Sequence, residues 1–364
     1  MIERVELKGL TWDDPRGYGP LKAVESAYNA ATTGPAVDIS WTIQPLGGFE
    51  SRPLVEVFGQ FDLIVADHPH MADAAELDLL CPIDDLSHDY VGLTRESYRY
   101  GDRFFAVPVD AGCHVAAYHP DRIKAAPRSW NGVEQLVQEG ARVATPLAGV
   151  HSLMALLALI ASERPADMAN FVAFTQDEVS AALNQLRWLK SICLAESLEW
   201  NPIEALQALA DGKCDYVPIT FGYAHFQSCG IRFHDLPAKN AHGRGRGILG
   251  GAGMAVSAVS RHADVAKDFC RFCGSSEVQS SLWPTSGGQP AHRAAWNALA
   301  TTNPFYRDTR LAMGTAQLRP RCPGFNDIQS AVGSEIHSWL ADGNPSDRRQ
   351  PSLKRLQNAI PCMT

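Results

Sequence analysis

The chain has 364 residues, of which 45% are hydrophobic and 20% charged, and its formal net charge is -8 at pH 7. This length exceeds what one compact core usually holds, so we expect two domains in a folded, soluble protein. The acidic balance argues against nucleic acid as a partner. No apolar run approaches the ~20 residues that span a bilayer, so we expect no membrane insertion. We interpret four arginines as solvated loop charge: Arg244, Arg246, Arg319 and Arg321.

Strands and helices alternate in the first part of the chain, which is typical of a parallel sheet with crossover helices. The expected strands cover residues 4–10, 37–43 and 61–66, and the expected helices cover residues 18–31 and 71–80. Residues 103–118 form a long apolar stretch that a Pro-x-Asp-x-Gly pattern interrupts. We expect the chain to cross here into a second domain.

The second domain is expected to combine four helices with three strands. The helices are predicted at 130–139, 152–163, 176–195 and 203–212, and the strands at 141–145, 216–220 and 231–236. A strand over residues 250–259 provides a return crossing, and helices over 326–342 and 353–360 close the chain. Two crossings between two α/β domains predict a ligand cleft lined by hinge strands and by loops at the carboxyl ends of strands.

Six short motifs follow one another at the places where such a cleft would be lined. They are LTWDDPRGYGPL, DLIVADHPH, AVPVD, YVPITFGYAHF, ILGGAG and TSGGQP. Their order and spacing resemble the family 1 extracellular solute-binding proteins, the ligand-capturing subunits of ABC importers. The resemblance implies an α/β, type II periplasmic-binding-protein fold. It implies lobe 1 over residues 1–112 and 250–318, lobe 2 over 119–245, and C-terminal helices over 319–364 that pack across the lobes.

The loop after the first expected strand carries aromatic and charged side chains. Trp12 and Tyr18 offer stacking surface for a sugar or an aromatic ring, and Arg16 can bind a carboxylate through two N–H groups. Asp14 is either a ligand contact or simply the N-cap of the next helix.

Residues 67–70, Asp-His-Pro-His, follow the third expected strand. His68 and His70 could bind ligand hydroxyls or a carboxylate, or act as acid and base near neutral pH. The alternative is a proline-stiffened loop in which Asp67 caps the next helix. Two histidines around a proline supply too few ligands for a metal, so we predict no metal site and no cofactor.

Further ligand contacts are expected along both crossings. Asp110 is a candidate hydrogen-bonding residue, and Cys113 is either buried or a contact. Adjacent residues of a strand point to opposite faces, so Cys113 and His114 cannot form a nucleophile–base pair. Phe221 and Tyr223 follow a second-domain strand and are further candidates. Gly250 and Gly251 are expected to form a turn that exposes backbone N–H groups, and Trp283 and Ser286 lie in a loop near the return helix.

The nine cysteines are odd in number and irregular in spacing, and the N-terminus shows no secretory signal. Both features favour the cytoplasm. A periplasmic location, with an ABC permease as partner, follows only if an upstream signal peptide was removed. Cys270 and Cys273 fall within a helical pattern, and we interpret them as a core pair.

Two functions stay open at this point. The first is a binding protein that closes two lobes around a small polar molecule, either a saccharide or a carboxylated compound. The alternative is a cytoplasmic enzyme on the same scaffold. In such an enzyme, histidines and carboxylates of the cleft would run proton-transfer chemistry as a decarboxylase, isomerase or lyase.

Overall fold

The computed structural model describes residues 4–164, 174–239, 245–342, 351, 353 and 354. The mixed α/β chain divides into two compact units. Unit 1 contains Met1–Ala111, Gly250–Leu299 and Arg321–Asn326. Unit 2 contains Gly112–Leu249, Ala300–Pro320 and Asp327–Thr364. The chain therefore leaves unit 1 after Ala111 and returns at Gly250.

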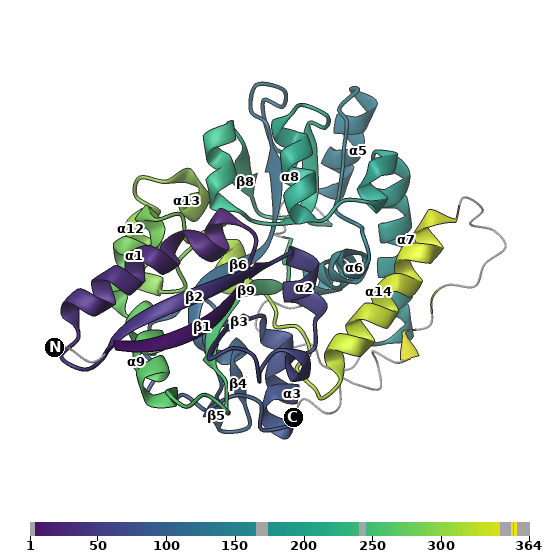
Figure 1. Ribbon diagram of the computed structural model, residues 1–364. Coiled ribbons are helices and arrows are strands. Elements are labelled where there is room, and N and C mark those ends of the chain that lie inside the picture. Colours follow the sequence, from purple (N-terminus) through teal and green to yellow (C-terminus); the bar gives the residue numbers. More distant parts are fainter. Residues whose placement is uncertain (1–3, 165–173, 240–244, 343–350, 352, 355–364) are drawn as a thin grey trace. The chain divides into compact units, whose positions relative to one another are not determined.

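The sheet of unit 1 has strand β1 (Arg4–Trp12) between β2 (Ala36–Gln44) and β3 (Leu63–Ala66), as Figure 1 shows. Both neighbours run parallel to β1, as predicted, and helix α1 (Pro15–Ala31) connects β1 to β2. All four side chains of β3 are buried, which explains its continuous apolar sequence. On its other side β3 pairs antiparallel with β9 (Leu249–Val256).

Short helices and a two-stranded ribbon complete unit 1. They are α2 (Leu46–Ser51), η1 (Leu54–Glu56), η2 (His68–His70), α3 (Met71–Glu76), α4 (Thr94–Ser97), β4 (Arg99–Tyr100), β5 (Arg103–Phe104), α9 (Ala263–Cys273), α10 (Ser276–Ser280), α11 (Leu282–Thr285) and α12 (Arg293–Leu299). Cys270 and Cys273 are both buried on α9. The two cysteines are therefore core residues of unit 1.

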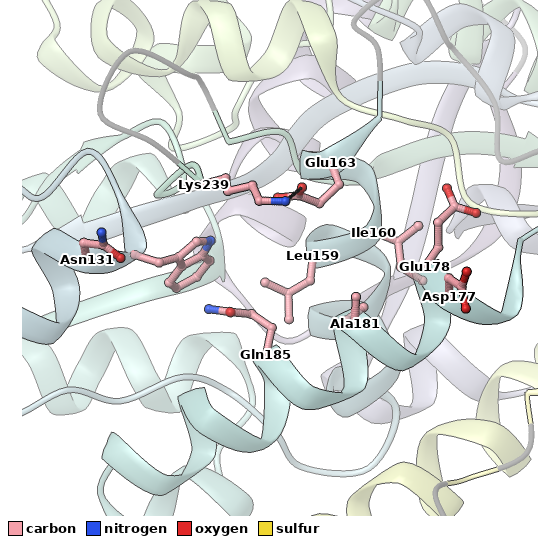
Figure 2. A pocket seen from close by; sticks show the side chains of 11 residues that line it. Asn131, Leu159, Ile160, Glu163, Asp177, Glu178, Ala181, Gln185 and Lys239 are labelled. Atoms are coloured by element: carbon pink, nitrogen blue, oxygen red, sulfur yellow. Dashed lines mark hydrogen bonds and ion pairs between the residues drawn. The ribbon is translucent and has the colours of Figure 1, made fainter.

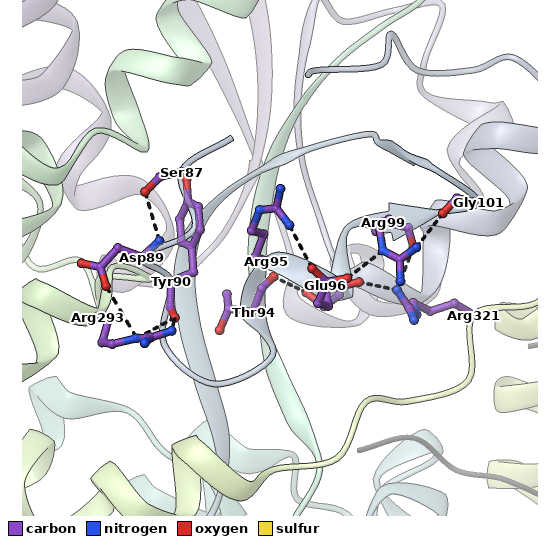
Figure 3. A network of polar contacts seen from close by, with 11 residues as sticks. Ser87, Asp89, Tyr90, Thr94, Arg95, Glu96, Arg99, Gly101, Arg293 and Arg321 are labelled. Carbon is purple, nitrogen blue, oxygen red and sulfur yellow. Dashed lines mark hydrogen bonds and ion pairs between the residues drawn. The ribbon is translucent and has the colours of Figure 1, made fainter. Parts of the chain in front are cut away.

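A polar network around α4 holds distant segments of unit 1 together (Figure 3). Glu96 binds Arg95 at 3.0 Å and Arg99 at 2.6 Å. Arg321 donates to the backbone oxygens of Glu96 and Arg99, and Arg293 donates to the backbone oxygen of Tyr90. The bonds of Arg321 hold in place the segment that leads to Asn326. Asn326 itself contributes to the candidate site.

Strand β6 (Val107–Tyr118) begins in unit 1 and continues into unit 2. Its unit 2 part pairs antiparallel with β7 (Tyr216–Phe221) and β8 (Arg232–His234). The other elements are α5 (Trp130–Gln138), α6 (Val150–Glu163), α7 (Gln176–Ile192), η3 (Ala195–Leu198), α8 (Pro202–Ala210), η4 (Ala224–Cys229), α13 (Pro304–Thr315) and α14 (Phe325–Ala341), whose first residues belong to unit 1.

Some predictions for these segments are wrong. Strand β6 passes through Pro108 and Asp110 without the expected break. The strand expected at 141–145 is absent, because Val143 makes only isolated bridges to Cys193 and Tyr216. Helix α12 was not predicted.

Helix α13 was also missed, and it packs in unit 2 although residues up to 318 were assigned to lobe 1. The reason is that Phe305 contacts Phe233 of β8, at 5.1 Å between ring centroids, and its backbone N–H donates to Gln227. Arg246 is buried and donates to the backbone oxygen of Thr315, and Arg319 is buried too, so neither is solvated loop charge. Arg321 is half-buried and donates to the backbone oxygens of Glu96 and Arg99, so it is not solvated loop charge either. The fourth expected loop arginine, Arg244, lies outside the described residues, as does most of the expected helix over 353–360.

Candidate functional site

The strongest concentration of predicted site residues lies at the carboxyl edge of the parallel strands of unit 1. Trp12 ends β1 directly opposite Gln44, which ends β2, and Asp67 follows the end of β3. Parallel strands end at one edge, so the loops that follow them meet there. These predicted site residues therefore lie in or next to neighbouring loops of unit 1.

The loop after β1 is packed more tightly than predicted. Asp14 is the N-cap of α1, and its carboxylate accepts from the backbone N–H of Arg16 at 2.8 Å. The Trp12 side chain is only 4% exposed and stacks on Phe49, with 4.9 Å between ring centroids. Gly17 lies so close to the indole that a Cβ atom there would approach it to 2.5 Å. Trp12 thus serves the packing of the loop, and Tyr18, at 38% exposure, is the open aromatic side chain.

Arg16 binds a carboxylate within its own unit. Its Nε lies 2.6 Å from Oδ2 of Asp110 and its Nη2 lies 2.5 Å from Oδ1, and both side chains are buried. Burial raises the pKa of the Asp110 carboxyl above its usual value, and the Arg16 charge opposes that rise. Arg16 thus binds a carboxylate of the protein itself, and a contact between Arg16 and a ligand stays a prediction.

Both histidines after β3 are buried, His68 completely and His70 to 2% exposure. The Asp67 carboxylate caps helix η2 by accepting from the backbone N–H of His68 at 2.8 Å, as the capping alternative proposed. Nδ1 of His70 lies 2.7 Å from the side-chain nitrogen of Asn326. His70 is thereby oriented by the Arg321–Asn326 segment.

A small cavity of about 10 Å³ opens beside these residues, which is room for about one water-sized group. Three polar side chains, Gln44, Arg52 and His70, line it together with Gly48 and with apolar residues of the unit 1 core: Leu10, Phe49, Leu54, Val57, Ile64, Val65 and Ala66. The Oε1 atom of Gln44 is buried and has no hydrogen-bond partner in the described part of the chain. Gln44, Phe49 and Asn326 were not among the predicted site residues. Of these three, only Gln44 could have been recognised from sequence, because it lies at the end of a strand.

The return segment supports Asp110 from its backbone side. Gly251 has a φ of 119°, and a Cβ atom there would lie 2.4 Å from the Asp110 carbonyl oxygen. Gly250 directly precedes it, and both glycines lie inside strand β9, so the predicted Gly-Gly turn is wrong. Trp283 is buried against Gly288, and the half-buried Ser286 lies next to Gly19 of α1. The segment from Trp283 to Gly288 therefore packs against the start of α1.

Three predicted site residues belong to unit 2. Cys113 is buried, and its carbonyl oxygen accepts from the backbone N–H of Gly222 at 3.1 Å. The Phe221 ring lies 4.1 Å from that of His114, and Tyr223 is buried at the start of η4. The pKa of His114 lies far below its usual value, and burial of the imidazole is the largest cause.

Among the described residues, no group of three or more His, Cys, Asp or Glu side chains is arranged to hold a metal ion. No helix in the same part of the chain is long and apolar enough to cross a membrane.

Residues 26–302 match the family of bacterial extracellular solute-binding proteins. This match covers well over half of the 364 residues. The chain therefore belongs to the bacterial extracellular solute-binding protein family, as its sequence motifs indicated.

Solved structures show the same fold. Maltose-bound MalE3 of T. maritima has a TM-score of 0.76 at 16% identity, over 98% of this chain and 97% of that one. An ABC transporter solute-binding protein from Thermotoga lettingae TMO, bound with alpha-D-tagatose, has a TM-score of 0.77 at 12% identity, over 100% of both chains. The GacH receptor of Streptomyces glaucescens GLA.O has a TM-score of 0.76 at 16% identity, over 99% and 98%. The chain thus has the fold of the two-lobed sugar-binding proteins.

Proposed function

We propose that this protein binds a small saccharide and that the carboxyl edge of the unit 1 sheet supplies part of its ligand site. The observation that carries the proposal is the unpaired Gln44 oxygen in the small cavity that Gln44 and His70 help to line. Its Gln44 oxygen lacks a partner in the described chain, and an unpaired buried oxygen costs free energy that a ligand O–H group would recover. Family membership and the saccharides named for the similar structures support the same ligand class.

The cavity is too small to enclose a sugar ring, so we propose that it receives one hydroxyl group of a larger ligand. Arg16 and Asp14 would then act indirectly. They hold the loop after β1 in place through the Asp110 pair and the helix cap. The closure of two lobes around the ligand stays a prediction, as do the contacts predicted for Cys113, Phe221 and Tyr223.

An ABC permease is the proposed partner if the protein is exported. The family description names an extracellular location, whereas the odd cysteine count favours the cytoplasm. Fractionation of the native host, with detection of the protein by antibody, separates the two locations.

Calorimetric titration with a panel of mono- and oligosaccharides, starting with maltose and tagatose, tests the ligand class. We expect micromolar or tighter binding of at least one saccharide. Gln44→Ala should weaken that binding about tenfold, the value of one hydrogen bond to a buried group. Gln135→Ala, which changes an exposed glutamine on α5, should leave it unchanged. Binding of no saccharide, or equal binding by Gln44→Ala, would contradict the proposal.

Recovery of the ligand tests the enzyme alternative in the same samples. A binding protein returns the saccharide with unchanged mass after long incubation. A modified product that disappears in His70→Ala would instead support catalysis.

A further inference from the structure

Unit 2 contains a cavity of about 420 Å³ that involves none of the residues of the candidate saccharide site. It lies between the start of α5, the end of α6 and the start of α7. Its lining is Trp130, Asn131, Leu159, Ile160, Glu163, Asp177, Glu178, Ala181, Ala182, Gln185 and Lys239. The volume falls within the range of small-molecule sites in proteins.

The floor of this cavity is apolar. Leu159 and Ile160 of α6 and Ala182 of α7 are buried, and so is the Trp130 indole. The Trp130 ring is held edge-on against Trp188, with 6.0 Å between centroids and an interplanar angle of 86°. A flat apolar group could therefore pack here against a rigid surface.

The rim of the cavity carries an excess of negative charge. Figure 2 shows Glu163 and Lys239 on one side and Asp177 with Glu178 at one end. Lys239 pairs with Glu163 at 3.2 Å, and Glu178 binds Arg164 at 3.0 Å. Asp177 is exposed and makes no ion pair with a described residue. Its carboxylate is thus available to a positive charge that enters the cavity.

We propose that this cavity binds a small molecule with a flat apolar body and one ammonium group. The body lies on Leu159 and Ile160, where it displaces water from apolar surface, and the ammonium group binds Asp177. A saccharide fits less well, because its hydroxyl groups would face Leu159 and Ile160 without hydrogen-bond partners. The site is therefore separate from the proposed saccharide function, and either can fail without the other.

The probe is phenethylammonium, with 3-phenylpropanoate as a compound of similar shape and opposite charge. Titration followed by NMR should show binding of phenethylammonium to the full chain, and binding of the anion at least tenfold weaker. Asp177→Asn should weaken phenethylammonium binding about tenfold, as expected when one charged hydrogen bond is lost. Added salt should weaken binding to the original protein more than to this variant.

Two further variants separate the cavity from general surface effects. Ala181→Phe places a ring in the cavity from an exposed position of α7 and should abolish binding. Glu134→Gln removes an exposed carboxylate of α5 that does not line the cavity, and it should bind as the original protein does. Circular dichroism checks that each variant is folded. Absence of phenethylammonium binding, equal binding of the anion, or unchanged binding in Asp177→Asn would overturn the proposal.

Discussion

Arg16 and Asp110 lie 94 positions apart in the sequence, yet the guanidinium of one makes a two-point contact with the carboxylate of the other inside unit 1. One residue opens α1 and the other lies in β6 just before the chain leaves the unit. The pair therefore joins the loop after β1 to the crossing strand.

Removing one member of this pair should destabilise the protein strongly, because the other charge stays buried without its partner. We expect Arg16→Met to lower the free energy of unfolding by about 3–5 kcal/mol. Urea unfolding followed by circular dichroism measures the change. Arg103→Met is the control, because Arg103 and Asp84 form an exposed pair at 3.5 Å, and it should cost less than about 1 kcal/mol. Similar losses of unfolding free energy in both variants would show that the buried pair stabilises the protein no more than the exposed pair does.

Gly17 should not tolerate a side chain, because its Cβ atom would approach the Trp12 ring to 2.5 Å. Gly17→Ala is expected to cost about 1–3 kcal/mol of unfolding free energy through overpacking. Gly47→Ala is the matched change on α2, where no atom lies within 4 Å of the added Cβ, and it should be neutral or slightly stabilising. Thermal denaturation of the two variants side by side measures both effects. If Gly17→Ala melts with the original protein, the loop after β1 is looser than the structure indicates.

His234 should make the protein less stable as the pH falls. Burial lowers the pKa of His234 to about 4, whereas an unfolded histidine titrates near 6.5. Between these values the unfolded state takes up a proton and the native state does not, so stability decreases from pH 7 towards pH 4. We expect His234 to account for about 1–2 kcal/mol of the loss at pH 5.

His234→Phe keeps an aromatic ring beside Tyr216 and removes this titration. Urea unfolding at pH 7 and pH 5 should therefore show a smaller loss in the variant than in the original protein. Part of the loss of stability should persist in the variant, because the pKa of His114 also lies below its usual value. An identical pH dependence in both proteins would assign the effect to other groups.

Cysteine reactivity should separate the exposed Cys229 from thiols whose pKa is raised by burial. Cys229 is exposed, whereas burial raises the pKa of Cys193 and of Cys214 to about 12 and also raises those of Cys270 and Cys273. Only a thiolate reacts quickly, so Cys229 should be alkylated by iodoacetamide at least tenfold faster than these four. Peptide mapping by mass spectrometry measures each site. Fast labelling of Cys270 or Cys273 in the folded protein would contradict their place in the core.

The strand ends of unit 1 were predictable because they depend on local patterns. The apolar run that ends at Ala66, followed by Asp67, predicted a buried parallel strand with polar residues at its edge, and β3 has this form. The same logic predicted a strand over residues 4–10 with Trp12 in the loop after it, and in the structure β1 continues to Trp12.

The partners of the site residues were not predictable, because they come from distant parts of the chain. Nothing local distinguishes Asp110 from another carboxylate as the partner of Arg16, and nothing near His70 indicates Asn326. Burial was missed for a related reason. His68 looks polar in sequence, and only the packing of the unit 1 core around it shows that it is fully enclosed.

The pairing of β3 with β9 has a consequence for synthesis on the ribosome. Ala66 pairs with Gly253, so one side of an entirely apolar strand lacks its neighbour until about 190 more residues have been made. At ~5–20 residues per second this interval lasts ~10–40 s. During that time the nascent chain presents an open strand edge of the kind that aggregates, and protection by a chaperone would be most valuable then.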